Sequence, residues 1–191
     1  MNIVTTPDPR LRVKCKKVNH VDDEIHEMIE NMIRNCLDWE KEHKYEISAA
    51  LAAPQLGYDR RIIVVREDTE NKENATFIPL LNPEVIKTEG KIERDYEGCL
   101  SVPSYYGKVP RPTKARIKAQ TIDGQEVRIK ADGFLARTLL HEIDHLNGIL
   151  FIDHIKDDKD AWYRLDSKGD LVPINYDEEV ANNKDLFPDE D

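Results

Sequence analysis

The segment from residue 132 to residue 147 constrains the fold of this chain more than any other. Its apolar residues recur with a helical period, at Leu135, Leu139, Ile143 and Leu146. The sequence His-Glu-Ile-Asp-His at 141–145 falls within that period, so its two histidines stand one turn apart on one helix face. Asp132 is a candidate N-cap, and Gly148 is a stop signal. The pattern therefore predicts a helix from about Asp132 to Asn147.

The rest of the chain predicts one more long helix and several strands. Apolar residues at helical spacing behind Asp22 predict an amphipathic helix from about Asp22 to Lys41. Polar residues 67–74 predict a surface loop. Short β-branched or alternating runs predict strands at 61–65, 77–81 and 84–88, with a break at Asn82-Pro83, a hairpin over 115–131 with a two-residue turn at Asp123-Gly124, and a late hairpin over 162–174.

Composition limits the class of protein. The 28 Lys and Arg residues and 38 Asp and Glu residues give a net charge of −10. Such acidity argues against duplex DNA as a partner, because phosphate binding needs clustered Lys and Arg. No run approaches the roughly 18 apolar residues of a membrane helix, and the first residues resemble neither a signal peptide nor a transit peptide. We therefore expect a cytoplasmic protein that binds neither DNA nor a membrane.

Length and charge distribution predict the domain organisation. A chain of 191 residues fits one domain, which we place at residues 1–175. From Asp170 onward the chain holds eight acidic residues against the single base Lys184. We therefore expect residues 176–191 to form an acidic, disordered tail.

The paired histidines predict a metal site. Both imidazoles can reach one ion, and Glu142 beside the first can act as general base on a water molecule. A catalytic site of this kind needs three protein ligands and one open position. One class of metalloproteases supplies a third histidine downstream, but Phe151 stands at that position and His154 follows too late. Glu178 or Glu179 could serve, but both lie in the acidic stretch. An endoprotease thus lacks a convincing third ligand.

Cys99 is an upstream candidate for the third ligand. It lies within Glu97-Gly98-Cys99-Leu100-Ser101, where Gly98 lets the backbone approach a ligand closely. A thiolate is a soft ligand that suits zinc, iron or cobalt. The alternative is a small buried apolar side chain, the usual state of a free cysteine. We expect that state for Cys36, on the apolar face of the first helix.

Three ordered motifs resemble the peptide deformylase family. Glu-Gly-Cys-Leu-Ser at 97–101 precedes His-Glu-x-x-His at 141–145, in which Asp144 stands before the second histidine. Residues 48–55, Ser-Ala-Ala-Leu-Ala-Ala-Pro-Gln, match the second half of the family's Gly-x-Gly-x-Ala-Ala-Pro-Gln stretch. The opening Pro-Asp-Pro-x-Leu is also similar, and the resemblance covers about residues 1–165. It implies an α+β fold in which antiparallel strands pack around a central helix that carries the HExxH motif.

The resemblance also implies an activity and the residues that perform it. The family's reaction is metal-dependent removal of the N-formyl group from the formylmethionine that begins newly made proteins. The motifs then imply Glu142 as general base and acid, with Gln55 and the backbone N–H of Leu100 as donors to the oxyanion. The implied ligands of one divalent metal are Cys99, His141 and His145. Iron(II) is the expected metal, and zinc, nickel and cobalt are alternatives. We expect a monomer whose partners are nascent polypeptide N-termini, with the ribosome as a further candidate.

The first motif departs from the family pattern, because Ser48 and Ala50 replace both glycines. In the family this stretch lies along the substrate, and backbone groups at the second glycine pair with the peptide. Ala50 keeps those groups but adds a methyl group. An alternative function therefore stays open: a deformylase-like protein with a different acyl-amide substrate range, or a non-catalytic peptide-binding role.

Two pairs of residues near the cysteine motif allow two interpretations each. Arg111 and Glu97 could pair and steady the Cys99 loop, or they could be independent surface charges. Tyr105 and Tyr106 could line a substrate groove, or they could belong to a packed loop.

Overall fold

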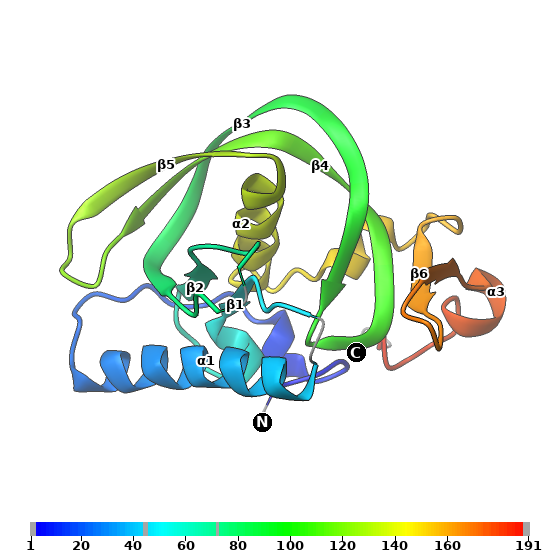
Figure 1. The fold of residues 1–191 in the computed structure, drawn as a ribbon, viewed down its shortest axis with the longest axis horizontal. Helices are drawn as coiled ribbons and strands as arrows, with labels where there is room; N and C mark the ends of the chain where they lie inside the picture. Colours follow the sequence, from blue (N-terminus) through cyan, green and yellow to red (C-terminus); the bar gives the residue numbers. More distant parts are fainter. Residues whose placement is uncertain (1–2, 44–45, 72, 189–191) are drawn as a thin grey trace.

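The fold is built around one central helix. The computed structural model describes residues 3–43, 46–71 and 73–188. Helix α2 lies at the centre, the long strands β3 and β4 arch over it, and α1 runs beneath β1 and β2 (Figure 1). The elements are α1 (Asp23–Glu42), β1 (Ala50–Ala52), β2 (Ile62–Arg66), β3 (Phe77–Cys99), β4 (Val102–Gln120), β5 (Glu126–Asp132), α2 (Gly133–His145), β6 (Trp162–Leu165), β7 (Leu171–Pro173) and α3 (Tyr176–Glu179), with 3₁₀ turns η1 (Pro9–Arg12), η2 (Ala53–Leu56) and η3 (Phe151–Ile155). The expected α+β class is confirmed.

The strands form one antiparallel sheet. Its order is β1-β2-β3-β4-β6-β7, and β5 pairs with β4. Every residue of β2 is buried. Successive side chains of a strand point to opposite faces, so both faces of β2 are covered. Ile63 and Val65 pack into the cluster around α2, whereas Ile62 and Val64 pack into the cluster around α1. The two helices therefore cover opposite faces of this strand.

Helix α2 is held by its apolar face and by a glycine at its end. Leu139 and Ile143 are buried against Ile117 of β4. The helix ends at His145 with Leu146 as C-cap, and Gly148 ends the following turn with φ +76°, where a Cβ would lie 2.5 Å from the carbonyl oxygen of Arg12. Only glycine combines this left-handed backbone with such a close approach, so the predicted stop is confirmed.

The N-cap of α2 works differently from the usual capping bond. Asp132 occupies the N-cap position, as predicted, but its side chain makes no capping hydrogen bond. Its carboxylate instead pairs with Lys114 of β4 at 3.1 Å. The helix start is thus linked to the sheet by an exposed ion pair.

Several expected elements are present. Helix α1 and strand β2 begin within one residue of prediction, and β6 and β7 form the expected late hairpin. Residues 67–71, 73 and 74 belong to no helix or strand, as expected, and residue 72 lies outside the described residues.

Strand β3 corrects the expected break at Asn82-Pro83. The strand runs without interruption from Phe77 to Cys99. The pairing register with β4 shifts between Leu81 and Glu84, and Asn82 takes φ +51°. A bulge therefore absorbs the proline, which cannot donate to the ladder.

The turn between β4 and β5 is also longer than predicted. The Thr121 N–H donates to the Gln125 oxygen at 2.9 Å, and the Gly124 N–H donates to the Thr121 oxygen at 2.9 Å. Gly124 has φ +77°. These bonds define a three-residue loop that ends on a left-handed glycine, so the expected two-residue turn is wrong.

The C-terminal residues differ from the expected disordered tail over 176–191. Residues 176–188 include α3, and Val180 and Leu186 are buried with Trp162 in one apolar cluster. Sparse apolar side chains among many acids are enough to hold this segment on the sheet. Residues 189–191 lie outside the described residues.

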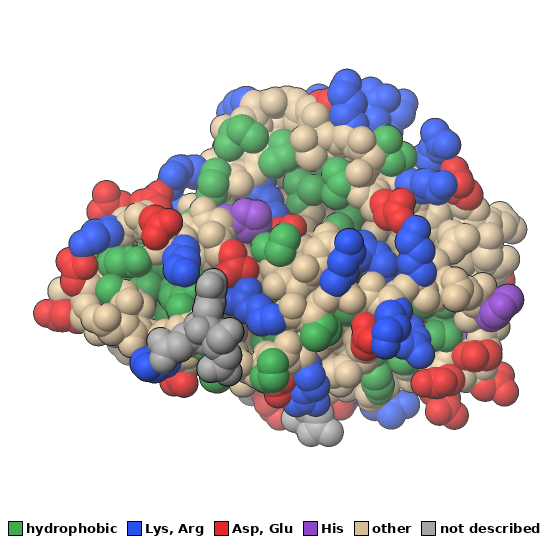
Figure 2. Space-filling model, turned by 180° about the vertical axis from the view of Figure 1, so that it is seen from behind, with side chains coloured by type: hydrophobic (Ala, Val, Ile, Leu, Met, Phe, Trp, Pro, Cys, Tyr) green, Lys and Arg blue, Asp and Glu red, His purple; other side chains and the backbone are tan. Residues whose placement is uncertain are grey.

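The surface carries charges of both signs. On the face in Figure 2, basic and acidic side chains are interspersed. Exposed ion pairs also occur along the strands, such as Arg116 with Glu89. In the described part of the chain, no helix has the length and apolar character needed to cross a bilayer.

The core around α2 predicts a contrast between two leucines of that helix. Leu139 is 1% exposed and Leu135 is 41% exposed. Leu139→Ala is expected to lower the free energy of unfolding by about 2–5 kcal/mol, because it leaves a cavity. Leu135→Ala should cost less than about 1 kcal/mol. Urea unfolding followed by circular dichroism measures both, and equal losses would contradict the assigned packing.

Candidate metal centre and active site

Cys99 is positioned by the tight turn that joins the two longest strands. It ends β3 and pairs with Val102 at the start of β4, across Leu100 and Ser101. The register shifts between Gly98 and Cys99. A Cβ at Gly98 would lie 2.5 Å from the ring of Tyr106. The sequence predicts a close approach of this glycine to a ligand, but its close neighbour is the Tyr106 ring.

Three ligand atoms meet where this turn crosses α2. The Cys99 Sγ lies 3.2 Å from the His145 Nε2, and one ligand atom from each of Cys99, His141 and His145 lies within 4.8 Å of the others. Both histidines are buried and Cys99 is half-buried. Ligand bonds of about 2.0–2.3 Å to one ion can bridge such separations. A thiolate with two imidazoles is a donor set that suits zinc or iron, so these residues fit the implied metal.

Glu97 connects this cluster to the strands. Its Oε2 lies 2.9 Å from the His141 Nδ1, and its carboxylate accepts hydrogen bonds from Arg111 Nε at 2.8 Å and Arg137 Nη1 at 2.7 Å. Burial acts to raise the pKa of Glu97, but the bonds from His141 and Arg111 outweigh it and hold the pKa well below its usual range. The expected pairing of Arg111 with Glu97 is confirmed.

The partners of Glu97 orient the first histidine. With its Nδ1 bonded to Glu97, the His141 ring presents its Nε2 as the remaining ligand atom. Arg111 also donates to Asp144 Oδ2 at 2.6 Å, and His154 Nε2 lies 2.7 Å from the same oxygen. Sequence patterns did not reveal Arg137, whose partner Glu97 lies 40 residues away. They also did not reveal the Asp144–His154 pair, which joins α2 to the separate turn η3.

Glu142 lies between the two histidines in sequence and at the floor of a cleft. Its side chain is buried, and its Oε2 has no hydrogen-bond partner among the described residues. Burial raises the pKa of Glu142 to about 7. A buried carboxyl with one uncommitted oxygen can accept a proton from a water molecule in the cleft.

Gln55 reaches the cluster from η2, directly after β1. Its Oε1 accepts the Ala52 N–H at 2.8 Å. Its Nε2 donates toward Cys99 Sγ at 3.5 Å and Ser101 Oγ at 3.3 Å. The amide is therefore fixed with its NH₂ group toward the site.

The N-terminal arm, the segment that contains Val4 and Thr6, forms hydrogen bonds to both the Gln55 motif and the Cys99 motif. The Val4 N–H donates to the backbone carbonyl oxygen of Gln55 at 2.7 Å, and the Thr6 N–H donates to the backbone carbonyl oxygen of Ser101 at 2.9 Å. These backbone bonds carry no side-chain signature, so sequence patterns could not reveal them.

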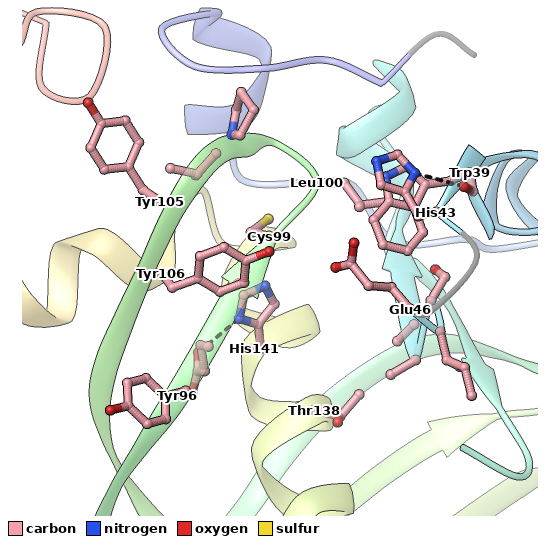
Figure 3. A pocket seen from close by; sticks show the side chains of 18 of the residues that line it. Trp39, His43, Glu46, Tyr96, Cys99, Leu100, Tyr105, Tyr106, Thr138 and His141 are labelled. Carbon is pink, nitrogen blue, oxygen red and sulfur yellow. Dashed lines mark hydrogen bonds and ion pairs between the residues drawn. The ribbon is translucent and has the colours of Figure 1, made fainter. Parts of the chain in front are cut away.

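The cleft over the cluster has a volume of about 770 Å³. Its floor includes Gln55, Cys99, Leu100, His141 and Glu142. In Figure 3 the side chains of Tyr106 and Glu46 approach this floor from opposite walls, whereas Tyr105 points away from Cys99. Both tyrosines line the cleft, as the groove interpretation expects, and Tyr105 also packs against the apolar cluster that contains Trp162.

Ala50 presents its backbone to this cleft. Strand β1 is an edge strand, and the Arg66 N–H donates to the Ala49 oxygen at 2.8 Å. Because hydrogen-bonded positions alternate in an antiparallel pair, the N–H and C=O of Ala50 point away from β2. The described non-glycine residues with positive φ are Asn82 and Ser104, so Ala50 needs no glycine-like backbone.

The ligand geometry predicts that Cys99→Ser loses most of its bound metal while staying folded, because a serine hydroxyl is a poor substitute for a thiolate. Metal content per chain, measured by mass spectrometry after purification, tests this result, and circular dichroism checks the fold. Cys15→Ala is the matched control, since Cys15 is buried in the apolar cluster around α2. A full equivalent of metal in Cys99→Ser would exclude Cys99 as a ligand.

Comparisons with known proteins agree with this geometry. The polypeptide deformylase family model matches residues 1–161. A peptide deformylase of Thermomicrobium roseum is 41% identical over 169 residues, which cover 87% of this chain and 92% of that protein. One of Halothermothrix orenii is 47% identical over 148 residues, 78% of this chain and 88% of that protein.

Solved structures show the same likeness. The crystal structure of a Synechococcus elongatus peptide deformylase in complex with actinonin superposes with a TM-score of 0.73 at 35% identity, covering 83% of this chain and 82% of that one. With a family match over most of its length, the chain belongs to the polypeptide deformylase family, the metal-dependent hydrolases that remove the N-formyl group from newly made proteins.

Proposed function

We propose that this chain hydrolyses the formyl amide of nascent polypeptides at the floor of the cleft, with one divalent metal held by Cys99, His141 and His145. The observation that carries the proposal is the meeting of these three ligand atoms beside the buried Glu142. When bound, the metal supplies Lewis acidity toward the carbonyl oxygen and lowers the pKa of a water molecule toward neutrality.

Glu142 moves the proton in this proposal. Its uncommitted Oε2 accepts a proton from the attacking water, whose oxygen forms a bond to the formyl carbon. Glu142 then donates the proton to the nitrogen of the departing peptide as the C–N bond breaks. Formate and a free amino terminus leave, and the carboxylate is regenerated.

Gln55 and the backbone N–H of Leu100 stabilise the negative charge that develops on the formyl oxygen. The Gln55 amide is held by the Ala52 N–H, so its NH₂ group needs little reorganisation during the reaction. Donors that are fixed in advance contribute more than donors that must be ordered.

The substrate peptide extends along the free edge of β1. The outward N–H and C=O of Ala50 can pair with an extended peptide, as an added strand does. Ala50 and Ser48 both line the cleft, and because the Ser48 hydroxyl is buried, it leaves the backbone groups of Ala50 available.

Iron(II) is the metal we propose, with zinc, nickel and cobalt as alternatives that the same donor set accepts. An endoprotease is less well supported. His154 is bonded to Asp144, and Glu178 and Glu179 belong to α3, apart from the ligand group. Cytoplasmic location, a monomeric state and ribosome contact stay predictions.

The proposed activity predicts rapid deformylation of a formyl-Met peptide by protein that is prepared without oxygen and loaded with iron(II). Formate release measures the rate. Glu142→Ala should abolish turnover, since it removes the buried carboxyl that is proposed to transfer the proton, while retaining metal. Exposure to air should reduce the activity of the iron form more than that of a nickel form.

Three results would contradict the proposal. Unchanged turnover in Glu142→Ala would exclude its role as base. Fully metal-loaded protein without turnover would favour the non-catalytic peptide-binding alternative. Cleavage inside an unformylated protein would point to an endoprotease.

The oxyanion role predicts a separate effect for Gln55. Gln55→Ala should reduce kcat by about 10²–10³-fold, as loss of one oxyanion donor does elsewhere, with the metal content unchanged. Steady-state kinetics on the formyl-Met peptide test this, and Gln125→Ala in the exposed β4–β5 turn is the control. A loss confined to KM would assign Gln55 to binding alone.

A further inference from the structure

The residues after the family match form one wall of the cleft. The match ends at residue 161, and β6, β7 and α3 follow it. Strand β6 pairs with β4 at Tyr106 and Gly107. Arg164 and Leu165 of β6 border the cleft directly. The C-terminal segment, residues 162–188, is thus joined to the strand that carries Tyr106.

An apolar cluster fixes the C-terminal segment in place. Trp162 is 1% exposed, and its ring lies 6.3 Å from that of Tyr105 and 6.0 Å from that of Phe187, both edge to face. Val180 and Leu186 are fully or almost fully buried in the same cluster. The segment therefore packs against the outer side of the cleft wall.

Polar bonds join the segment to Tyr105. The Asn183 Nδ2 donates to the Tyr105 hydroxyl at 3.0 Å and to the backbone carbonyl oxygen of Glu179 at 3.2 Å. The Tyr105 hydroxyl donates to the Glu179 oxygen at 3.4 Å. An ion pair between Arg164 and Glu179 at 2.9 Å links α3 to β6 as well.

The anchored tyrosine sets the position of its neighbour. Tyr105 points toward the C-terminal segment, and Tyr106 points toward Cys99 (Figure 3), as alternation along a strand requires. The Tyr106 ring packs over Gly98. Ser104, directly before the pair, has φ +70°, a conformation that non-glycine residues adopt only where their surroundings hold it.

We propose that Asn183 is a positioning residue. Its hydrogen bond fixes the position of Tyr105, and Tyr105 in turn fixes the neighbouring Tyr106. Tyr106 then forms the wall that contacts the substrate residues after the formylmethionine. The reacting amide lies at the floor near Glu142, so the wall contacts the peptide as it leaves the cleft. The C-terminal segment thus contributes to binding of longer peptides and not to the chemical step. This inference rests on the proposed deformylase activity.

The test compares two substrates, formyl-Met amide and formyl-Met-Ala-Ser. Asn183→Ala is expected to raise KM for the tripeptide by about 3- to 10-fold, the cost of ordering one or two side chains on binding. Its kcat on both substrates and its KM for the amide should stay within about twofold of the parent protein. Tyr105→Phe should give a similar tripeptide effect, and the double variant should add little, because both substitutions remove the same bond.

Matched controls come from the same segment. Asn175→Ala removes the N-cap of α3, and Tyr176→Phe removes a bond to the Lys156 oxygen. Neither side chain bonds to Tyr105 or Asn183, so both substitutions should raise the tripeptide KM much less than Asn183→Ala does. Thermal unfolding of all five variants shows that each is folded.

The possible outcomes distinguish failure of the positioning role of Asn183 from failure of the proposed deformylase activity. If the parent protein turns over neither substrate, the proposed function fails. If it is active and Asn183→Ala behaves like the controls, the positioning role is wrong. Equal losses on both substrates, or a loss in kcat, would also overturn it, because a wall effect acts only on the longer peptide.

Discussion

The buried carboxylate of Glu97 is the constraint on which the rest of the site depends. It bonds to His141 on α2 and to Arg111 on β4, and it lies two residues before Cys99 on β3. One side chain therefore links the helix that carries two of the proposed metal ligands to the hairpin that carries the third. Arg137, which also donates to backbone oxygens of β3 and β4, closes the network from the helix side.

The charges of this network balance. Glu97 and Asp144 are matched by Arg111 and Arg137, so the cluster adds no net charge beside the metal ligands. Removing one partner of such a buried pair typically costs about 3–5 kcal/mol, because the remaining charge stays buried without compensation. The arrangement thus favours a site that forms as a unit, in which ligand orientation and fold stability depend on the same bonds.

Sequence patterns predicted the parts of the site that lie close together along the chain. The i, i+4 spacing placed His141 and His145 on one helix face, and the family motifs pointed to Cys99 and Gln55. The sequence could not give Arg137 or the bonds of the N-terminal arm, since these contacts join residues far apart and use backbone groups. It also misplaced the limits of β3 and the β4–β5 turn, where a bulge and a left-handed glycine depend on pairing with β4. The C-terminal residues looked disordered because acids outnumber the few apolar residues that anchor them.

The floor and the walls of the cleft differ in structure because they have different roles in the proposed reaction. Chemistry at the floor requires ligand atoms that hardly move, and buried ion pairs on long strands supply that rigidity. The walls need only present surfaces to a peptide. On one side Ala50 stands where the family pattern has a glycine, and on the other the wall is supported by residues that follow the family-model match. The side chains that bond to Glu97 are Arg111, Arg137 and His141, which belong neither to β1 nor to residues 162–188. The range of peptides accepted can therefore change in this fold without disturbing the proposed metal ligands.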